Sequence, residues 1–367
     1  MKNFISNLIT VYKAEHLKKK KKGIYWTSFI IGILFPLLGF VLSMKDGYLN
    51  HITQLPYNFY EQFISKSIMG FAGFFFPLII IITAGRIVQL DHKNGGWKLM
   101  ETSPINKTSI YFGKFSVLLT SNLIAILSFS ISSIIFCMTL ILKGKIPIEA
   151  STNLPIGFML QLIFRLFIGS ILISAIQYVL SVYFKALTWP TLIGFVGLIA
   201  SLFARAIFMT KIDWNPFRMI ENVGFNTHGS DLGNLLLYTE WLSLILSIPI
   251  LAIGLSIYQY KSFNFAFIKN KKRGGIITLI SIATLVIAGY FLTPKQMGNY
   301  HKNIIAGTIE SDTPIENIYL INSVTKDTIV KAPVENNIFH AEVDLQLTTD
   351  YYLLTADNKF ENKIFLG

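Results

Sequence analysis

Long runs of apolar residues without any charge restrict the fold of this chain more than any other feature of its sequence. Three runs, 24–43, 67–85 and 115–142, contain no Asp, Glu, Lys or Arg. A helix of about 20 apolar residues is long enough to cross the hydrocarbon core of a bilayer, which is about 30 Å thick. Backbone groups in lipid must satisfy their hydrogen bonds internally, which favours helices. The sequence therefore predicts an α-helical polytopic membrane protein.

The composition agrees with this prediction, because 52% of the residues are hydrophobic and only 14% are charged. A soluble domain carries about 25% charged residues. We expect a six-span core followed by a seventh span. The seven predicted spans are 24–43, 67–85, 115–142, 154–184, 186–210, 235–260 and 276–293.

Lysine and arginine are distributed unequally between the predicted loops. With the N-terminus in the cytoplasm, the cytoplasmic segments hold 18 of the 32 basic residues, whereas the outer loops 44–66, 143–153 and 211–234 hold 6. Short cytoplasmic loops carry an excess of Lys and Arg. We therefore expect a multi-pass protein of the inner (cytoplasmic) membrane with its C-terminus outside the cytoplasm. The net charge of +12 is then a topology signal, and no nucleic acid is expected as a partner.

The sequence contains no common catalytic or cofactor-binding motif. It lacks G-x-x-x-x-G-K-[ST], H-E-x-x-H and G-x-S-x-G, and its six histidines are scattered. The single cysteine, Cys137, lies in an apolar run and cannot form an intramolecular disulfide. We expect no catalytic residue, no metal and no cofactor in this chain. If ATP drives it, another chain must bind the nucleotide.

Residues 294–367 differ from the rest of the chain. They contain ten acidic residues and six lysines, and short β-rich runs alternate with turn residues. This pattern predicts a small all-β domain outside the cytoplasm. The expected strands are 304–309, 318–321, 328–330, 338–345, 351–355 and 363–366, with turns at 313–314, 332–333 and 357–358.

The N-terminus predicts an amphipathic helix over residues 3–17. Phe4, Leu8, Val11 and Tyr12 recur at helical spacing, and five lysines follow at 18–22. Such a helix would lie in the inner membrane interface before the first span. The alternative is an ordinary solvated N-terminus.

The cytoplasmic loop 86–114 joins the second and third predicted spans. After Gly95-Gly96 it contains an aromatic residue and mixed charges, followed by Ser103-Pro104. The pattern predicts a short helix, a turn, and a helix that continues into the next span. This surface could bind a cytoplasmic protein, or it could be a plain interfacial loop anchored by Trp97.

This loop, NGGWKLMETSPINKTSIYFGK, resembles the coupling region of type-2 ABC exporter permeases, and the N-terminal YKAEHLKKKKKGIYW resembles their elbow helix. The bacteriocin-immunity and multidrug-type permeases are the most similar. The resemblance covers about residues 1–265. It implies a dimeric permease, formed with a second copy or a paralogue, that exports a substrate with the help of a separate cytoplasmic ABC ATPase. The ATPase would bind Trp97, Lys98, Met100, Glu101, Pro104 and Lys107.

The sequence as a whole predicts a division of the chain into four parts. These are the elbow helix 1–23, the permease domain 24–265, a basic linker with the seventh span at 266–293, and the β-domain 294–367. The last two parts depart from the usual pattern of the family. The tail, IIAGTIES…ENIYLINSVTKDTIVKAPVENNIFHAEVDL, resembles a small β-domain at the N-terminus of some secreted bacterial thiol–disulfide proteins. No C-x-x-C is present, so this resemblance implies a docking or sensing module with an extracytoplasmic partner.

Other functions remain open at this point. The main alternative is a membrane-anchored sensor or assembly factor that works through the β-domain. An intramembrane transferase would need a group of His, Asp and Glu residues at one interface, and the spans offer only Glu240. A secondary transporter is a further alternative, although no inverted repeat is evident.

Three charged residues, Arg165, Arg205 and Glu240, lie within the predicted spans. Charges inside a membrane are costly and are usually paired or functional. Arg205 and Glu240 each lie about five residues from the outer end of their span, which places both roughly 8 Å deep. We expect them to form an ion pair that Arg165 could join. The alternative is that Arg205 and Glu240 extend separately to the outer interface.

Overall fold

A computed structural model describes residues 2–20, 23–44, 58–92, 105–145, 150–184, 186–208, 215–225, 235–260 and 271–292, and six strands between 303 and 364. The chain forms two compact units, Met1–Thr293 and Pro294–Gly367, which are described separately.

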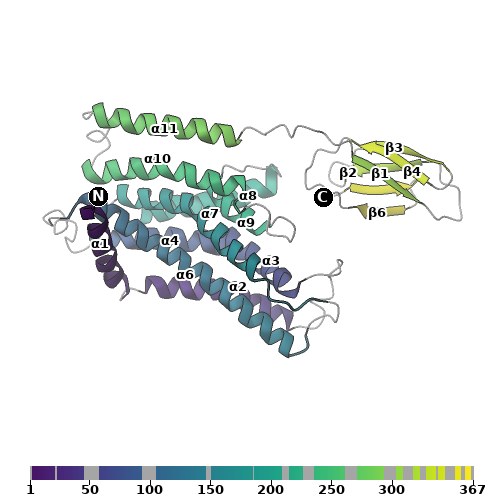
Figure 1. Cartoon of the computed structure of the whole chain (residues 1–367), viewed down its shortest axis with the longest axis horizontal. Helices are drawn as coiled ribbons and strands as arrows, with labels where there is room; N and C mark the ends of the chain where they lie inside the picture. The colour runs from purple at the N-terminus through teal and green to yellow at the C-terminus, as the bar shows by residue number, and fades with distance from the viewer. Residues whose placement is uncertain are drawn as a thin grey trace. The chain divides into compact units, whose positions relative to one another are not determined.

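The first unit is built from helices that run alongside one another as a bundle, with the N-terminal helix lying across one end (Figure 1). In chain order they are α1 (Lys2–Lys20), α2 (Ile24–Ser43), α3 (Phe59–Gly70), the π-helix η1 (Phe71–Phe75), α4 (Phe76–His92), α6 (Lys107–Leu142), α7 (Ile156–Tyr183), α8 (Thr188–Phe208), α9 (Pro216–Phe225), α10 (Tyr238–Tyr260) and α11 (Lys271–Leu292).

Five of the described helical segments are long and apolar enough to cross a membrane. Four of them are the helices α2, α6, α7 and α10. The fifth is the continuous segment that α3, η1 and α4 form together, at Phe59–Gln89. Two more, α8 and α11, contain shorter apolar stretches, at Thr188–Phe203 and Gly274–Tyr290. Each predicted span thus falls on a helix, which confirms an α-helical polytopic membrane protein with five to seven apolar helices.

Two helical segments lie where the sequence predicted outer loops. The first is α3, whose cap residue Asn58 accepts hydrogen bonds from the backbone of Tyr60 (2.9 Å) and Glu61 (3.4 Å). The second is α9, within the predicted loop 211–234. Both carry charged residues, which interrupt the hydropathy signal. Both also bury apolar side chains against the bundle, among them Phe59 and Ile220.

The two ends of the bundle are named here by their helices. The loop end is where α4 ends, α6 begins, and α7 and α10 end. The far end is where α3, α7 and α10 begin, and α2 and α6 end. A cluster in which the rings of Phe71 and Phe129 stack with centroids 4.5 Å apart contributes to the core between the ends. A second cluster, around Tyr111 and Tyr178, lies at the loop end. Cys137 is a buried free cysteine.

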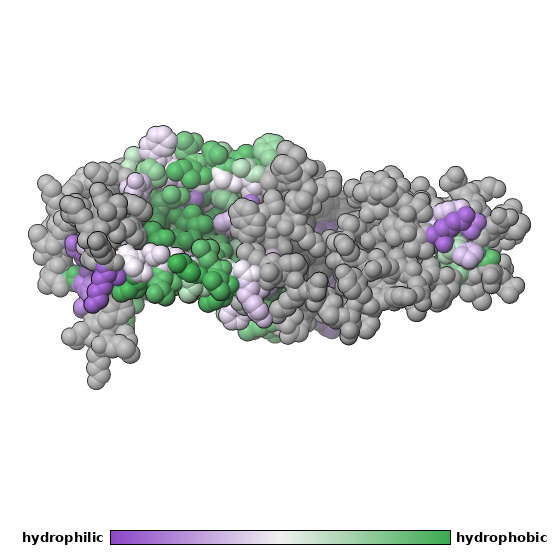
Figure 2. All heavy atoms as spheres, turned by 90° about the horizontal axis from the view of Figure 1, so that it is seen from above, coloured by the Kyte–Doolittle hydropathy of each residue, from purple (hydrophilic) through white to green (hydrophobic). Residues whose placement is uncertain are grey.

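Apolar side chains also cover much of the outer surface of the helices. Trp26 on α2, Leu142 on α6 and Leu279 on α11 are 67%, 87% and 70% exposed. Figure 2 shows one broad face on which hydrophobic side chains gather. Such a surface suits the hydrocarbon of a bilayer, in which exposed apolar side chains carry no cost.

The second unit is a six-stranded antiparallel sheet. Its strands are β1 (Asn303–Thr308), β2 (Asn317–Asn322), β3 (Thr328–Glu335), β4 (Ile338–Val343), β5 (Tyr352–Ala356) and β6 (Phe360–Ile364), in the spatial order β1-β4-β3-β2-β5-β6. Each strand overlaps one of the predicted runs, although β6 begins earlier than expected.

The predicted turn at Ala332-Pro333 is wrong, because both residues belong to β3. Pro333 pairs with Asn317 at the end of the ladder with β2, and the next residue, Val334, pairs with Phe339 of β4. Proline lacks an N–H and is tolerated where a ladder ends. Here β3 changes its pairing partner at the proline. The other two predicted turns lie outside the described residues.

Candidate functional site

The start of α6 follows the predicted docking loop directly. Asn106 caps this helix, and its side chain accepts a hydrogen bond from the backbone of Thr108 at 3.0 Å. Lys107, the first residue of α6, is exposed. The other predicted docking residues lie outside the described residues: Trp97, Lys98, Met100, Glu101 and Pro104. The described structure therefore shows where the loop is attached to the bundle.

Three hydrogen bonds connect the first turns of α6 to α7 and α10. Gln259 of α10 donates from Nε2 to Oγ1 of Thr108 at 3.0 Å. The Tyr111 hydroxyl donates to the carbonyl oxygen of Leu251 at 3.2 Å, and the Tyr178 hydroxyl of α7 donates to the carbonyl oxygen of Tyr111 at 2.7 Å. Both tyrosine side chains are fully buried. The start of α6 is thus held between two other helices.

The N-terminal helix packs on the same part of α6. The predicted helix is present as α1, and its Val11 is buried over Gly113. A Cβ added to Gly113 would lie 2.6 Å from Cγ1 of Val11, so this contact requires glycine. The Tyr12 hydroxyl lies 3.1 Å from Oγ1 of Thr120, which is farther along α6. Movement of α1 and movement of the α6 start are therefore mechanically linked.

A buried ion pair joins α7 to α10 at the far end. Nε of Arg165 donates to Oε1 of Glu240 at 2.8 Å, and the two side chains are 2% and 0% exposed. The backbone N–H of Leu237 donates to the other carboxylate oxygen of Glu240. Arg165 Nη2 is buried without a hydrogen-bond partner among the described residues. The pair neutralises two charges that would be costly to bury separately.

Ser243 extends this contact along the same two helices. Its hydroxyl lies 3.0 Å and 3.1 Å from the carbonyl oxygens of Ile168 and Gly169, and its Oγ accepts from the backbone N–H of Leu172 at 3.2 Å. One short side chain thus satisfies backbone groups of the neighbouring helix. The far-end contact between α7 and α10 is therefore continuous.

The structure brings together two of the three charged residues that the sequence singled out. Arg165 and Glu240 meet, whereas the side chain of Arg205 lies outside the described residues. The predicted Arg205–Glu240 pair therefore stays a prediction. Helix depth alone could not identify the partner of Glu240, because depth does not show which helices are neighbours.

The short helix α9 closes the far end against α7 and η1. Asn215 caps it by accepting from the backbone of Phe217 at 3.0 Å, and it donates to Oγ of Ser201 on α8 at 3.0 Å. A Cβ on Gly73 of η1 would lie 3.6 Å from Oε1 of Glu221, so the π-helix passes close to this buried acid. Asn215-Pro216, a cap followed by proline at the first helical position, is the signal that could have predicted this helix.

These contacts are structural, and they contain none of the groupings that catalysis by a metal would need. Within the described ranges, no three His, Cys, Asp or Glu residues lie close enough to hold a metal ion. The buried polar contacts instead hold helices against one another.

Comparison with known proteins identifies the class. Residues 11–201 match the model of the ABC-2 family transporter proteins, which is more than half of the chain. The chain belongs to this family and is a multi-pass membrane permease component of an ABC-2 type transporter. Such permease domains are typically non-catalytic and generally pair with an ABC ATPase. No curated protein matches the sequence.

The match confirms the predicted ABC permease at the level of the family. It includes the loop 86–114, α7 and most of α8, but it ends before α10 and α11. The bacteriocin-immunity and multidrug subgroup stays a prediction, and so does the resemblance of the tail to a domain of thiol–disulfide proteins.

Proposed function

We propose that this chain is the permease of an exporter that moves a substrate across the inner membrane, driven by ATP hydrolysis on a separate cytoplasmic ATPase. Membership of the ABC-2 family supports this proposal. The absence of a P-loop motif from the full sequence supports it as well, since nucleotide binding then falls to a partner. The chain itself needs no cofactor, and a second copy or a paralogue completes the translocation path.

The observation that carries the proposal is the position of the α6 start. The loop that would bind the ATPase, around Trp97–Lys107, leads directly into a helix start that is hydrogen-bonded to α10 and α7 through Thr108 and Tyr111. A displacement of the α6 start would therefore reach α7 and α10 through these hydrogen bonds. Rigid shifts of packed helices are a common route by which a local event changes a distant site.

Helix packing suggests which parts would move. Along α2 and α6, Ser28 and Ser121 lie 2.6 Å apart through their hydroxyls, and Gly32 packs against Ser128. The helices α7 and α10 form a second pair that is held by Arg165 and Glu240. We infer that ATP-driven closure of the partner shifts the first pair relative to the second. At the loop end, neutral hydrogen bonds join α6 of the first pair to α7 and α10 of the second pair.

The proposed topology places the N-terminus and the docking loop in the cytoplasm, and Pro294–Gly367 on the opposite side. This follows if all seven helices cross the membrane, with the excess of basic residues on the cytoplasmic side. The sheet unit would then act as an outer docking or sensing module. Protease added to spheroplasts, which expose the outer face of the inner membrane, should remove the C-terminal unit and leave an epitope at the N-terminus protected.

Cross-linking tests the docking loop without knowledge of the substrate. With Cys137→Ser as the background, a Trp97→Cys variant should form a cross-link in native membranes to a chain that contains a P-loop sequence. Trp189→Cys is the matched control, because Trp189 is 56% exposed at the same end of the bundle but lies outside the loop. Equal cross-linking from both positions would contradict a specific docking loop.

A binding test follows from the same residues. The double variant Trp97→Ala/Pro104→Ala should reach the membrane but lose most of its co-purifying ATPase, because the apolar contacts with the ATPase are removed. Trp189→Ala should retain the ATPase as wild type does. If the double variant still co-purifies with the ATPase to the wild-type extent, the assignment of the loop is wrong.

A further inference from the structure

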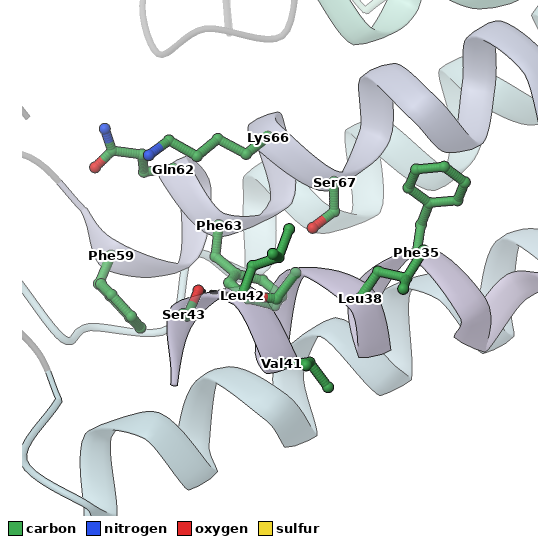
Figure 3. A pocket seen from close by; sticks show the side chains of 11 residues that line it. Phe35, Leu38, Val41, Leu42, Ser43, Phe59, Gln62, Phe63, Lys66 and Ser67 are labelled. Atoms are coloured by element: carbon green, nitrogen blue, oxygen red, sulfur yellow. Dashed lines mark hydrogen bonds between the residues drawn. The ribbon is translucent and has the colours of Figure 1, made fainter. Parts of the chain in front are cut away.

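A cavity of about 280 Å³ lies between α2 and α3 at the far end of the bundle. Its walls are mainly apolar and include Phe35, Leu38 and Leu42 of α2 and Phe63 of α3 (Figure 3). Leu38 and Leu42 are 46% and 42% exposed, so this apolar wall is open on its outer side. We call this cavity the α2–α3 groove. In a membrane its outer side faces lipid.

Two close approaches of α2 and α3 form the floor of the α2–α3 groove. A Cβ on Gly39 would lie 2.9 Å from Oγ of Ser67 and 3.4 Å from Cζ of Phe63. Farther in, a Cβ on Gly70 would lie 2.0 Å from Cε1 of Phe35. Because these two glycines lack a side chain, α2 and α3 pack closely along the floor. The larger side chains, among them Leu38 and Leu42, line the walls of the groove. The groove is therefore a built feature of the helix pair.

Polar groups gather on one side of the α2–α3 groove. Gln62 and Lys66 are four residues apart on α3 and so share a face of the helix. Figure 3 shows their polar ends close together, whereas Phe63 and Ser67 point toward α2. Oε1 of Gln62 is buried and has no hydrogen-bond partner among the described residues. A buried acceptor without a donor is unfavourable, and a ligand with a hydroxyl group would supply the missing donor.

The position of Lys66 in the sequence matches the boundary of a membrane span. Lys66 lies in α3 and immediately precedes the uncharged run 67–85. Its side chain is exposed, and the long side chain of a lysine at such a boundary can extend its ammonium group toward the interface. The cation and the amide of Gln62 thus lie beside an apolar groove, and we expect them near the level of the phosphate and glycerol groups.

We propose that the α2–α3 groove binds one anionic phospholipid of the outer leaflet, with a headgroup of the phosphoglycerol type. An acyl chain lies against Leu38, Leu42 and Phe63, the phosphate accepts from Lys66, and a headgroup hydroxyl donates to Gln62. A phosphocholine headgroup lacks the hydroxyl donor, and its negative phosphate and positive ammonium group give it a net charge of zero. The proposal goes beyond the transport function, and it requires neither the ATPase nor the transported substrate.

Native mass spectrometry of the purified full-length chain tests the proposal. The protein is reconstituted in nanodiscs that contain equal amounts of phosphatidylglycerol and phosphatidylcholine, and the lipids retained after release are compared. Wild-type protein should retain more phosphatidylglycerol than phosphatidylcholine. Lys66→Gln should reduce that retention about tenfold, the loss expected for a charge-assisted hydrogen bond, and Gln62→Leu about fivefold. Neither change should alter the retention of phosphatidylcholine.

Matched variants separate lipid binding from misfolding. Lys143→Gln removes a lysine at the same end of the bundle that does not line the groove, and it should retain lipid as wild type does. Leu38→Trp should fill the groove and abolish retention, whereas Leu37→Trp, on the neighbouring exposed position, should not. Size-exclusion profiles of all variants should match wild type.

Three results would overturn the proposal. The first is unchanged phosphatidylglycerol retention in Lys66→Gln. The second is equal retention of phosphatidylcholine by the wild type. The third is disulfide cross-linking of two chains through Leu38→Cys in membranes without any lipid retained, which would show that a second copy covers the groove. None of these results bears on the docking loop, since the ATPase is absent from the measurement.

Discussion

The helices α7 and α10 are held at their two ends by different chemistry. At the far end, Arg165 and Glu240 form a fully buried ion pair. At the loop end, the hydroxyls of Tyr178 and Tyr111 make neutral hydrogen bonds that reach α10 through α6. Removing one partner of a buried ion pair costs about 3–5 kcal/mol, whereas a neutral hydrogen bond contributes about 1 kcal/mol.

This difference indicates where the bundle can change shape. Separating the Arg165–Glu240 pair has a high free-energy cost, so this contact should keep α7 and α10 together through a conformational cycle. Neutral hydrogen bonds can exchange partners at low cost, and they occur where α6 begins, next to the docking loop. We therefore expect the far end of the α7–α10 pair to stay closed and the loop end to rearrange.

The largest effect should follow from Glu240→Ala. This change leaves the Arg165 guanidinium buried without its anion, and the free energy of unfolding should fall by about 3–5 kcal/mol. Denaturant unfolding of the purified protein in detergent measures this loss. The double variant Arg165→Met/Glu240→Leu should recover most of it, because neither charge of the pair then remains buried. A double variant as unstable as the single one would show that the ion pair is not the source of the effect.

Gly254→Ala should have the next largest effect. A Cβ at this position of α10 would lie 2.3 Å from Cγ2 of Val179 and 2.4 Å from the Tyr111 hydroxyl oxygen. Overpacking of this kind costs about 1–3 kcal/mol and would separate α10 from its neighbours at the loop end. Gly275→Ala is the matched control, because nothing lies within 4 Å of its added Cβ. Equal unfolding free energies for the two variants would contradict close packing at Gly254.

Tyr178→Phe should lower the free energy of unfolding by about 1 kcal/mol, because it removes the hydroxyl that donates to the Tyr111 carbonyl but keeps the buried ring. Tyr183→Phe, on an exposed position of the same helix, should change stability by less than about 0.5 kcal/mol. A loss as large as that of Glu240→Ala would remove the distinction between the two ends.

The smallest effect should come from Thr108→Val. The lost hydrogen bond to Gln259 is only partly buried, so we expect a change of at most about 1 kcal/mol. Amide hydrogen exchange in the last turn of α10 should nevertheless become faster, because that turn loses its attachment to α6. Thr139→Val, at the far end of α6, should leave this exchange unchanged. The same exchange rate in both variants would argue against a link between the docking loop and α10.

The sequence predicted the helical fold well because lipid imposes a simple requirement. A segment of about 20 uncharged apolar residues that crosses the membrane satisfies its backbone hydrogen bonds as a helix, and the run 115–142 does so within α6. The prediction failed where charged residues interrupt a helix that the protein itself covers, as at Glu61 in α3 and Glu221 in α9. Hydropathy measures the preference of side chains for an apolar environment, so it does not detect a short helix whose charged residues are interspersed with its apolar ones.

The candidate site was predictable only in part. The scarcity of charge in the predicted spans directed attention to Arg165, Arg205 and Glu240, and depth arithmetic predicted a pair between Arg205 and Glu240. Only the packing of α7 on α10 shows that Arg165 and Glu240 meet. The tyrosine contacts at the loop end carried no sequence signal, because Tyr111 and Tyr178 lie in runs where aromatic residues are common. Gly113 gave no signal either, since the contact that requires it comes from Val11, more than a hundred residues away in the chain.

The π-helix Phe71–Phe75 has a consequence for how this span could have arisen. A turn of this kind accommodates one additional residue, and in an α-helix one residue corresponds to a rotation of about 100°. Deleting that residue would turn α3 about its own axis relative to α4, and the side of α3 that carries Phe63 and Ser67 would no longer face α2. A single inserted codon is thus enough to let the two halves of one membrane crossing present unrelated faces to their neighbours.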